Sequence, residues 1–157
     1  MLLRKALSAY IASFAIVLFY SFYFSSDNLS GGLTRFGEIM QWMSLITLFA
    51  FPVVLIYGSL VSIVTEMVTG RLLHNEAWRV IVSCVCHLAL GALFGLLFGI
   101  PLFILTCAAA ALIYFLMDRL IGHLLARGWR KGTTIAVTLA SPLLVIAAIG
   151  GVTALGS

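Results

Sequence analysis

Long apolar runs alternate along the chain with short segments that carry most of its charged residues. An α-helix of about 20 apolar residues is long enough to cross the hydrocarbon core of a bilayer. The apolar runs cover approximately residues 6–24, 42–68, 80–99, 102–120 and 133–155. The pattern therefore predicts an all-α fold, an integral membrane helical bundle of about five transmembrane helices.

Two glycine and proline signals set the number of crossings. The apolar stretch from Val80 to Met117 is too long for one crossing, and Gly99-Ile100-Pro101 in its middle favours a tight turn. Pro52 lies inside the second run, where a membrane helix tolerates it as a kink. The last run contains Pro142 and a glycine pair, so four crossings with a re-entrant last segment are the main alternative.

The positions of the basic residues predict the orientation. Eight of the nine Lys and Arg residues fall in one set of alternating segments, and Arg35 alone falls in the other. The eight are Arg4, Lys5, Arg71, Arg79, Arg119, Arg127, Arg130 and Lys131. Because Lys and Arg are retained on the cytoplasmic side, we expect the amino terminus inside and the carboxyl terminus outside. The last three also form a basic patch at the membrane surface, where they would attract anionic lipid headgroups.

The composition excludes a water-soluble domain. The chain is 63% hydrophobic and 9% charged, with a mean hydropathy of +1.19. Its 157 residues leave no room for a folded domain beside the spans, so we expect residues 1–157 to form one transmembrane domain. The excess of basic residues lies between spans, so it indicates topology rather than nucleic-acid binding.

Small residues in the third run predict a helix contact. Gly91, Gly95 and Gly99 recur at four-residue spacing, which places them near one helix face. Close association of helices in lipid needs such small residues, because they let two backbones approach. The partner is either another helix of this chain or a second copy.

A candidate polar cluster combines Ser62 and Glu66 of the second run with His87 of the third, at similar predicted depth. One interpretation is a proton- or ion-handling site, because ionisable groups inside membranes often mark a pathway. The other is structural, with a neutral His87 bonded to a hydroxyl and Glu66 hydrated or paired with Arg71 near the interface.

The second and fourth runs also share a short pattern near their inner ends. An acid, a glycine, a base and a Leu-Leu pair recur at equal offsets, starting at Glu66 and at Asp118. Either this echo is a chance feature of apolar sequence, or two parallel helices each present an acid at the inner surface and form a docking edge.

The sequence predicts no catalytic residue, cofactor site or metal site. Cys84 and Cys86 are two apart on a helix and point to different faces, so they lack metal-ligand spacing. All three cysteines lie in apolar segments, an arrangement that offers no disulfide framework.

Two apolar segments carry a resemblance. The segment Leu55–Ile63, followed by an acid and then Thr69 and Arg71, resembles a segment of small uncharacterised multi-pass membrane proteins of Gram-positive bacteria. The run His87–Gly91 resembles a second such segment. The resemblance implies a multi-pass protein of a bacterial plasma membrane and implies no activity.

Three hypotheses follow for the function. The first is a non-enzymatic accessory or interaction subunit of a membrane complex, whose partners are the lipid bilayer and either another membrane protein or a second copy, with no nucleic acid. The second is a small transporter or channel component that uses Glu66 and His87. A membrane-embedded enzyme is the weakest, because no paired acids or histidine cluster is predicted to face a common cavity.

Overall fold

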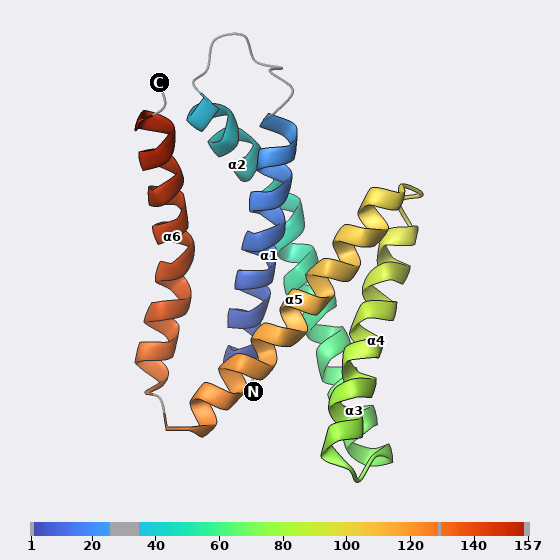
Figure 1. Ribbon diagram of the computed structural model, residues 1–157. Coiled ribbons are helices and arrows are strands. Elements are labelled where there is room, and N and C mark those ends of the chain that lie inside the picture. The colour runs from blue at the N-terminus through green and yellow to red at the C-terminus, as the bar shows by residue number, and fades with distance from the viewer. Residues whose placement is uncertain (1, 26–34, 129, 156–157) are drawn as a thin grey trace.

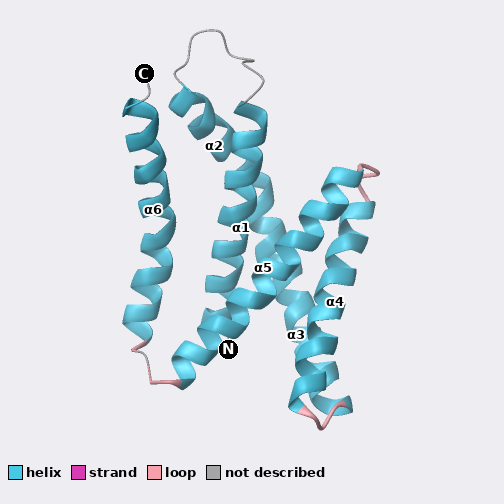
Figure 2. Cartoon of the chain, viewed as in Figure 1, coloured by secondary structure: helices cyan, strands magenta, loops and turns pink. Residues whose placement is uncertain are grey.

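The computed structural model describes residues 2–25, 35–128 and 130–155, and these residues are helical except for short connections (Figures 1 and 2). Five helical segments are long and apolar enough to cross a membrane. They are α1 (Leu2–Ser25), the continuous α2 (Arg35–Val53), η1 (Val54–Gly58) and α3 (Ser59–Leu72), then α4 (Glu76–Leu96), α5 (Pro101–Ala126) and α6 (Lys131–Leu155). The predicted all-α membrane bundle is confirmed. The helices extend beyond most of the predicted spans, because polar residues at the membrane boundary continue the helices.

Pro52 widens the second span instead of breaking it. Proline has no N–H to donate, and its ring crowds the carbonyl of the preceding turn, here that of Leu48. The following residues Val54–Gly58 adopt π-helical geometry, after which the α-helix resumes and continues to Leu72. The interruption is thus a single wide turn in a helix that is still long and apolar enough to cross a bilayer.

The predicted hairpin between the third and fourth spans is present. Helix α4 ends at Leu96, and Gly99 adopts a left-handed φ of 67°, which glycine reaches without a Cβ penalty. Pro101 is the first residue of α5, where its missing N–H leaves no helical bond unmade. Local sequence alone therefore sets this turn.

Helix α1 is the central helix, with the largest buried share of the five spans. It packs against α2, η1, α3, α5 and α6. Its residues Ser8, Ala9, Ala12 and Ser21 have no exposed surface. These small side chains let neighbouring backbones approach α1 closely, which is how helices associate in lipid.

The α4–α5 hairpin leans away from the rest of the bundle at its tip. Helix α3 packs against α4, and α1 packs against α5, where Tyr20 of α1 reaches Phe103 and Thr106 in the first turns of α5. Figure 1 shows the tip of the hairpin turned away from α2. This splayed arrangement sets the position of the cavity described below.

The start of α1 and the end of α6 lie at opposite ends of the bundle, as an odd number of crossings requires (Figure 1). We call the end that holds the start of α1 the inner end, because the basic residues predict that it is cytoplasmic.

This orientation is tested with single cysteines placed at Arg127 and at Ser157, after Cys84, Cys86 and Cys107 have been replaced by serine. In intact cells an impermeant maleimide should label the cysteine at 157 and should reach the one at 127 only after lysis. Labelling of both positions from the same side would contradict the prediction.

Candidate functional site

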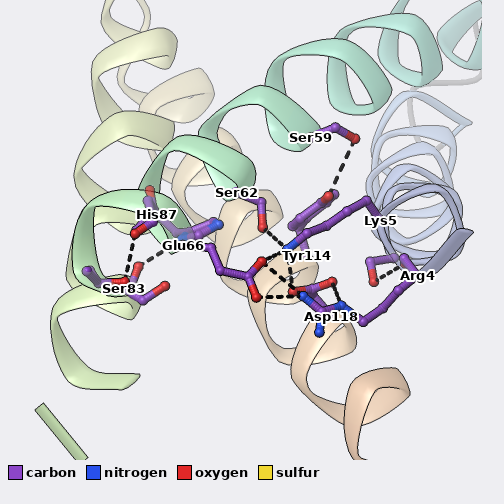
Figure 3. A network of polar contacts seen from close by, with 12 residues as sticks. Arg4, Lys5, Ser59, Ser62, Glu66, Ser83, His87, Tyr114 and Asp118 are labelled. Carbon is purple, nitrogen blue, oxygen red and sulfur yellow. Dashed lines mark hydrogen bonds and ion pairs between the residues drawn. The ribbon is translucent and has the colours of Figure 1, made fainter. Parts of the chain in front are cut away.

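A partly buried cluster of charged side chains joins α1 to α3 and α5 at the inner end (Figure 3). The Lys5 ammonium lies at its centre. Its Nζ is 2.6 Å from Ser62 Oγ, 2.7 Å from Asp118 Oδ2 and 2.9 Å from Glu66 Oε2. An ammonium group has three N–H donors, and these three oxygens can accept all of them.

Arg4 completes the cluster. Its Nε donates to Asp118 Oδ1 at 2.8 Å, and its Nη2 donates to the two Glu66 oxygens at 3.0 and 3.1 Å. The guanidinium also lies over Gly122, where a Cβ would come within 3.1 Å of Nη1. Two cations and two carboxylates therefore form a network with no net charge, which we call the charge cluster: Arg4, Lys5, Glu66 and Asp118.

Burial divides the charge cluster into a core and an edge. The side chains of Lys5 and Asp118 are only 2% and 8% exposed. Those of Arg4 and Glu66 are 25% and 41% exposed. Charges inside a membrane protein are tolerated when they are paired and hydrogen-bonded, because unpaired charges would lose hydration without compensation. The Lys5–Asp118 pair is thus the part whose disruption leaves a buried charge.

Position along the helices explains why these groups meet. Glu66 lies six residues before the end of α3 and Asp118 eight residues before the end of α5, or about 9 and 12 Å at the α-helical rise. Both helices run toward the inner end, where α1 begins. The two cations at the start of α1 therefore reach the same depth as the two acids.

Ser62 and Glu66 of the candidate polar cluster both contact Lys5, and among the described residues no hydrogen bond or ion pair joins either of them to His87. Glu66 pairs with Arg4 and Lys5 instead of Arg71, and Ser62 accepts from Lys5. Glu66 and Asp118, the two acids of the pattern repeated in the second and fourth runs, face α1 in the bundle instead of forming an exposed docking edge. The reason is that α1 lies against both α3 and α5.

Sequence reasoning assigned Arg4 and Lys5 to topology alone and did not place Asp118 in the site. The repeated pattern with Glu66 and Asp118 did contain a signal for Arg4 and Lys5, because two acids inside apolar helices require cations at the same depth. The remaining step, that the cations come from the chain's own first turn, depends on where α1 packs.

The glycine stripe of α4 is in contact with α5 over two of its three positions. A Cβ at Gly91 would lie 2.7 Å from the carbonyl oxygen of Cys107, and one at Gly95 would lie 2.6 Å from the Cα of Ile104. The partner of this face is thus another helix of the same chain. Gly99 has nothing within 4 Å of such a Cβ, because it belongs to the turn after α4 instead of the helix face.

A cavity of about 320 Å³ lies between α1, the α2–η1 segment and the α4–α5 hairpin. Its lining is almost wholly apolar and rich in aromatic residues, with Phe98 and Phe103 nearest the hairpin tip. The lining residues nearest the inner end are Val61, His87 and Tyr114. None of the four charged residues of the charge cluster lines the cavity, so the cavity ends short of that layer.

His87 is the buried histidine of this cavity, with 2% of its surface exposed. Its Nδ1 is 2.7 Å from the carbonyl oxygen of Ser83, one turn earlier in α4. Its ring lies 5.4 Å from that of Phe115 and stacks on that of Tyr114 at 6.3 Å between centroids. Its Nε2 has no hydrogen-bond partner among the residues that the structure describes.

The chain matches no protein-family model, no curated protein and no solved structure. It is a multi-pass helical membrane protein. Its five apolar helices carry that description, and no match supports the resemblance to proteins of Gram-positive bacteria.

Two further predictions concern the basic patch at the membrane surface and the metal-binding residues. Arg127, Arg130 and Lys131 are exposed around the connection from α5 to α6, and their membrane-surface role stays a prediction. The described part of the chain holds no group of three His, Cys, Asp or Glu side chains that could bind a metal ion.

Proposed function

We propose that this membrane protein is a non-enzymatic accessory subunit of a membrane complex in a bacterial plasma membrane, and that its binding element is the apolar cavity. The observation that carries this proposal is the cavity itself. Its volume of about 320 Å³ lies at the lower end of the range typical of ligand sites, and its lining is apolar. A molecule or chain segment taken from the bilayer would fill it favourably.

The two carboxylates are already held in ion pairs, which favours a binding function over catalysis. General acid–base chemistry needs a titratable group within reach of the reacting atoms. Glu66 and Asp118 do not line the cavity, and both are held by Arg4 and Lys5. The cavity thus supplies apolar contact and little chemistry.

The same facts weigh against a transporter or channel component that uses Glu66 and His87. An ion pathway needs polar or charged groups along its length. Glu66 is matched by two cations outside the cavity, whereas His87 lies among aromatic rings within it. The two residues do not line a common polar path through the described part of the bundle.

The contact surface differs from the one that the sequence suggested. A second copy was one of the two partners that the sequence offered for the α4 glycine face, but α5 occupies this face at Gly91 and Gly95. The cavity between α1, the α2–η1 segment and the α4–α5 hairpin is the feature left for a partner.

A cavity-filling substitution tests the proposal. Ala110 is buried and lines the cavity, whereas its neighbour Ala109 is exposed on another face of α5. We expect native mass spectrometry of the wild type, purified in mild detergent, to show a stoichiometric bound component. Ala110→Phe should lower its occupancy at least about tenfold, because the phenyl ring takes its place. Ala109→Phe, which adds the same bulk outside the cavity, should retain it.

Equal occupancy in both variants would contradict the proposal. So would a defined homo-oligomer that binds nothing and conducts ions in liposomes, which is the result expected of the rival function. The melting temperature of each variant reports whether it is folded, so that loss of binding is not confused with loss of structure.

A further inference from the structure

The corner where α3 is connected to α4 at the inner end carries two arginines that have no acidic partner among the described residues. We propose that Arg71 and Arg79 bind the phosphate group of an anionic phospholipid of the inner leaflet. The corner comprises residues 70–79, none of which lines the cavity. The site is therefore separate from the cavity and does not depend on the proposed function.

The guanidinium of Arg79 lies against the backbone of α3. Its Nη2 is 3.4 Å from the place that a Cβ on Gly70 would take, and glycine has no side chain to keep it away. Arg79 is accordingly half-buried, whereas Arg71, the residue after Gly70, is exposed. Both side chains start from the same corner, and a long arginine stem lets the charged end reach a headgroup.

Arg4 provides a comparison within the molecule. Its guanidinium lies over Gly122 of α5 in a similar way, with Nη1 3.1 Å from the place of a Cβ. Two carboxylates neutralise it, because Nε donates to Asp118 and Nη2 donates to Glu66. Arg79 lies over a helix glycine in the same manner, but both of these carboxylates are already bonded to α1. The anion that would complete its environment must come from elsewhere.

No acid of the described chain supplies that anion. Among the described residues, the side chains of Arg71 and Arg79 make neither an ion pair nor a hydrogen bond. Glu76 lies between them in the sequence, and it also has no ion-pair partner in the described chain. Two unmatched cations at one corner repel each other, whereas an anion bound between them would be attracted by both.

The surroundings of the corner favour a lipid as the source of the phosphate. Leu72 and Trp78 are both more than half exposed, on the two sides of the connection between α3 and α4. Tryptophan is favoured at the level of the headgroups, and an exposed leucine beside it can contact acyl chains. The inner leaflet contains anionic lipids, which attract basic residues near the membrane surface. Arginine suits this ligand because its planar fork donates two parallel hydrogen bonds to phosphate oxygens.

The test compares two variants of equal net charge. Arg71→Gln/Arg79→Gln removes both cations of the corner, and Arg127→Gln/Lys131→Gln removes two from the connection between α5 and α6. Each full-length protein is titrated in mild detergent with dioleoylphosphatidylglycerol or dioleoylphosphatidylcholine, and native mass spectrometry measures the bound lipid. We expect the wild type and the second variant to bind the anionic lipid about thirtyfold more tightly, the product of two arginine contributions at a membrane surface. The first variant should lose this preference.

Gly70→Leu tests the geometry without a change of charge. Its side chain would take the place of the Arg79 guanidinium, whose flexible end can move away without separating the helices. The preference for phosphatidylglycerol should fall to about fivefold, the contribution of one arginine. Gly132→Leu is the matched control, because Gly132 also lies beside a basic residue at the inner end and nothing lies within 4 Å of a Cβ there. It should keep the full preference.

The outcomes separate a specific site from general attraction. Equal preferences in the two double variants would show that net charge alone attracts the lipid, which would overturn the site. A full preference in Gly70→Leu would overturn the placement of Arg79 in it. Displacement of phosphatidylglycerol by an equal concentration of inorganic phosphate would show that the free anion is the ligand, which contradicts a lipid site. Ala110→Phe should leave the preference unchanged, so this proposal and the proposed function fail by different results.

Discussion

Replacing Asp118 with alanine should lower the free energy of unfolding by about 3–5 kcal/mol, the usual loss when one partner of a buried ion pair is removed. Asp118 accepts from both Arg4 Nε and Lys5 Nζ. Without it, two cations would share the single carboxylate of Glu66, and Lys5 is 2% exposed and cannot be hydrated in place. Reversible unfolding in mixed detergent micelles measures the effect.

Glu66→Ala is the matched control, because it removes the other carboxylate of the same cluster. Its side chain is 41% exposed, so water can take over part of its role and the loss should be nearer 1 kcal/mol, as for exposed pairs. The double variant Lys5→Leu/Asp118→Leu should recover most of the stability, because it removes both members of the buried pair. Equal losses for Asp118→Ala and Glu66→Ala would show that burial does not decide the energetics of the charge cluster.

Gly95→Leu should prevent the α4–α5 hairpin from packing, with a loss of stability above the roughly 1–3 kcal/mol typical of overpacked cores. A Cβ at this position would lie 2.6 Å from the Cα of Ile104 and 2.7 Å from the carbonyl oxygen of Phe103. Backbone atoms cannot turn aside as a side-chain end can, so the two helices must separate. A lower yield of monodisperse protein and a lower melting temperature in mild detergent would report this.

Gly151→Leu is the control for added bulk, because nothing lies within 4 Å of a Cβ at Gly151. It should leave the melting temperature nearly unchanged. Gly95→Ala should lie between the two, since its single methyl group still meets the α5 backbone. If Gly95→Leu melted like the wild type, α4 and α5 would not be in the contact that the structure describes.

The sequence by itself determined the features that depend on local chemistry and on the composition of each run. Twenty-residue apolar runs form helices in a bilayer because a helix satisfies the backbone N–H and C=O groups within the segment itself, so the five spans were predictable. Gly99 predicted the hairpin because glycine permits a left-handed φ, and Pro101 because proline fixes φ at a value that suits the first residue of a helix. Gly91 and Gly95 predicted a close helix contact, because their spacing clears one face of α4.

Only the tertiary structure decided which groups meet. Lys5 and Asp118 are 113 residues apart in the chain, and they pair because α1 lies in the centre of the bundle between α3 and α5. Depth along a helix is readable from sequence, but rotation about the helix axis relative to its neighbours is not. That rotation sends Ser62 and Glu66 toward α1 and leaves His87 among aromatic rings. The cavity likewise depends on the lean of the α4–α5 hairpin, which follows from the packing of whole helices against one another and from no single residue.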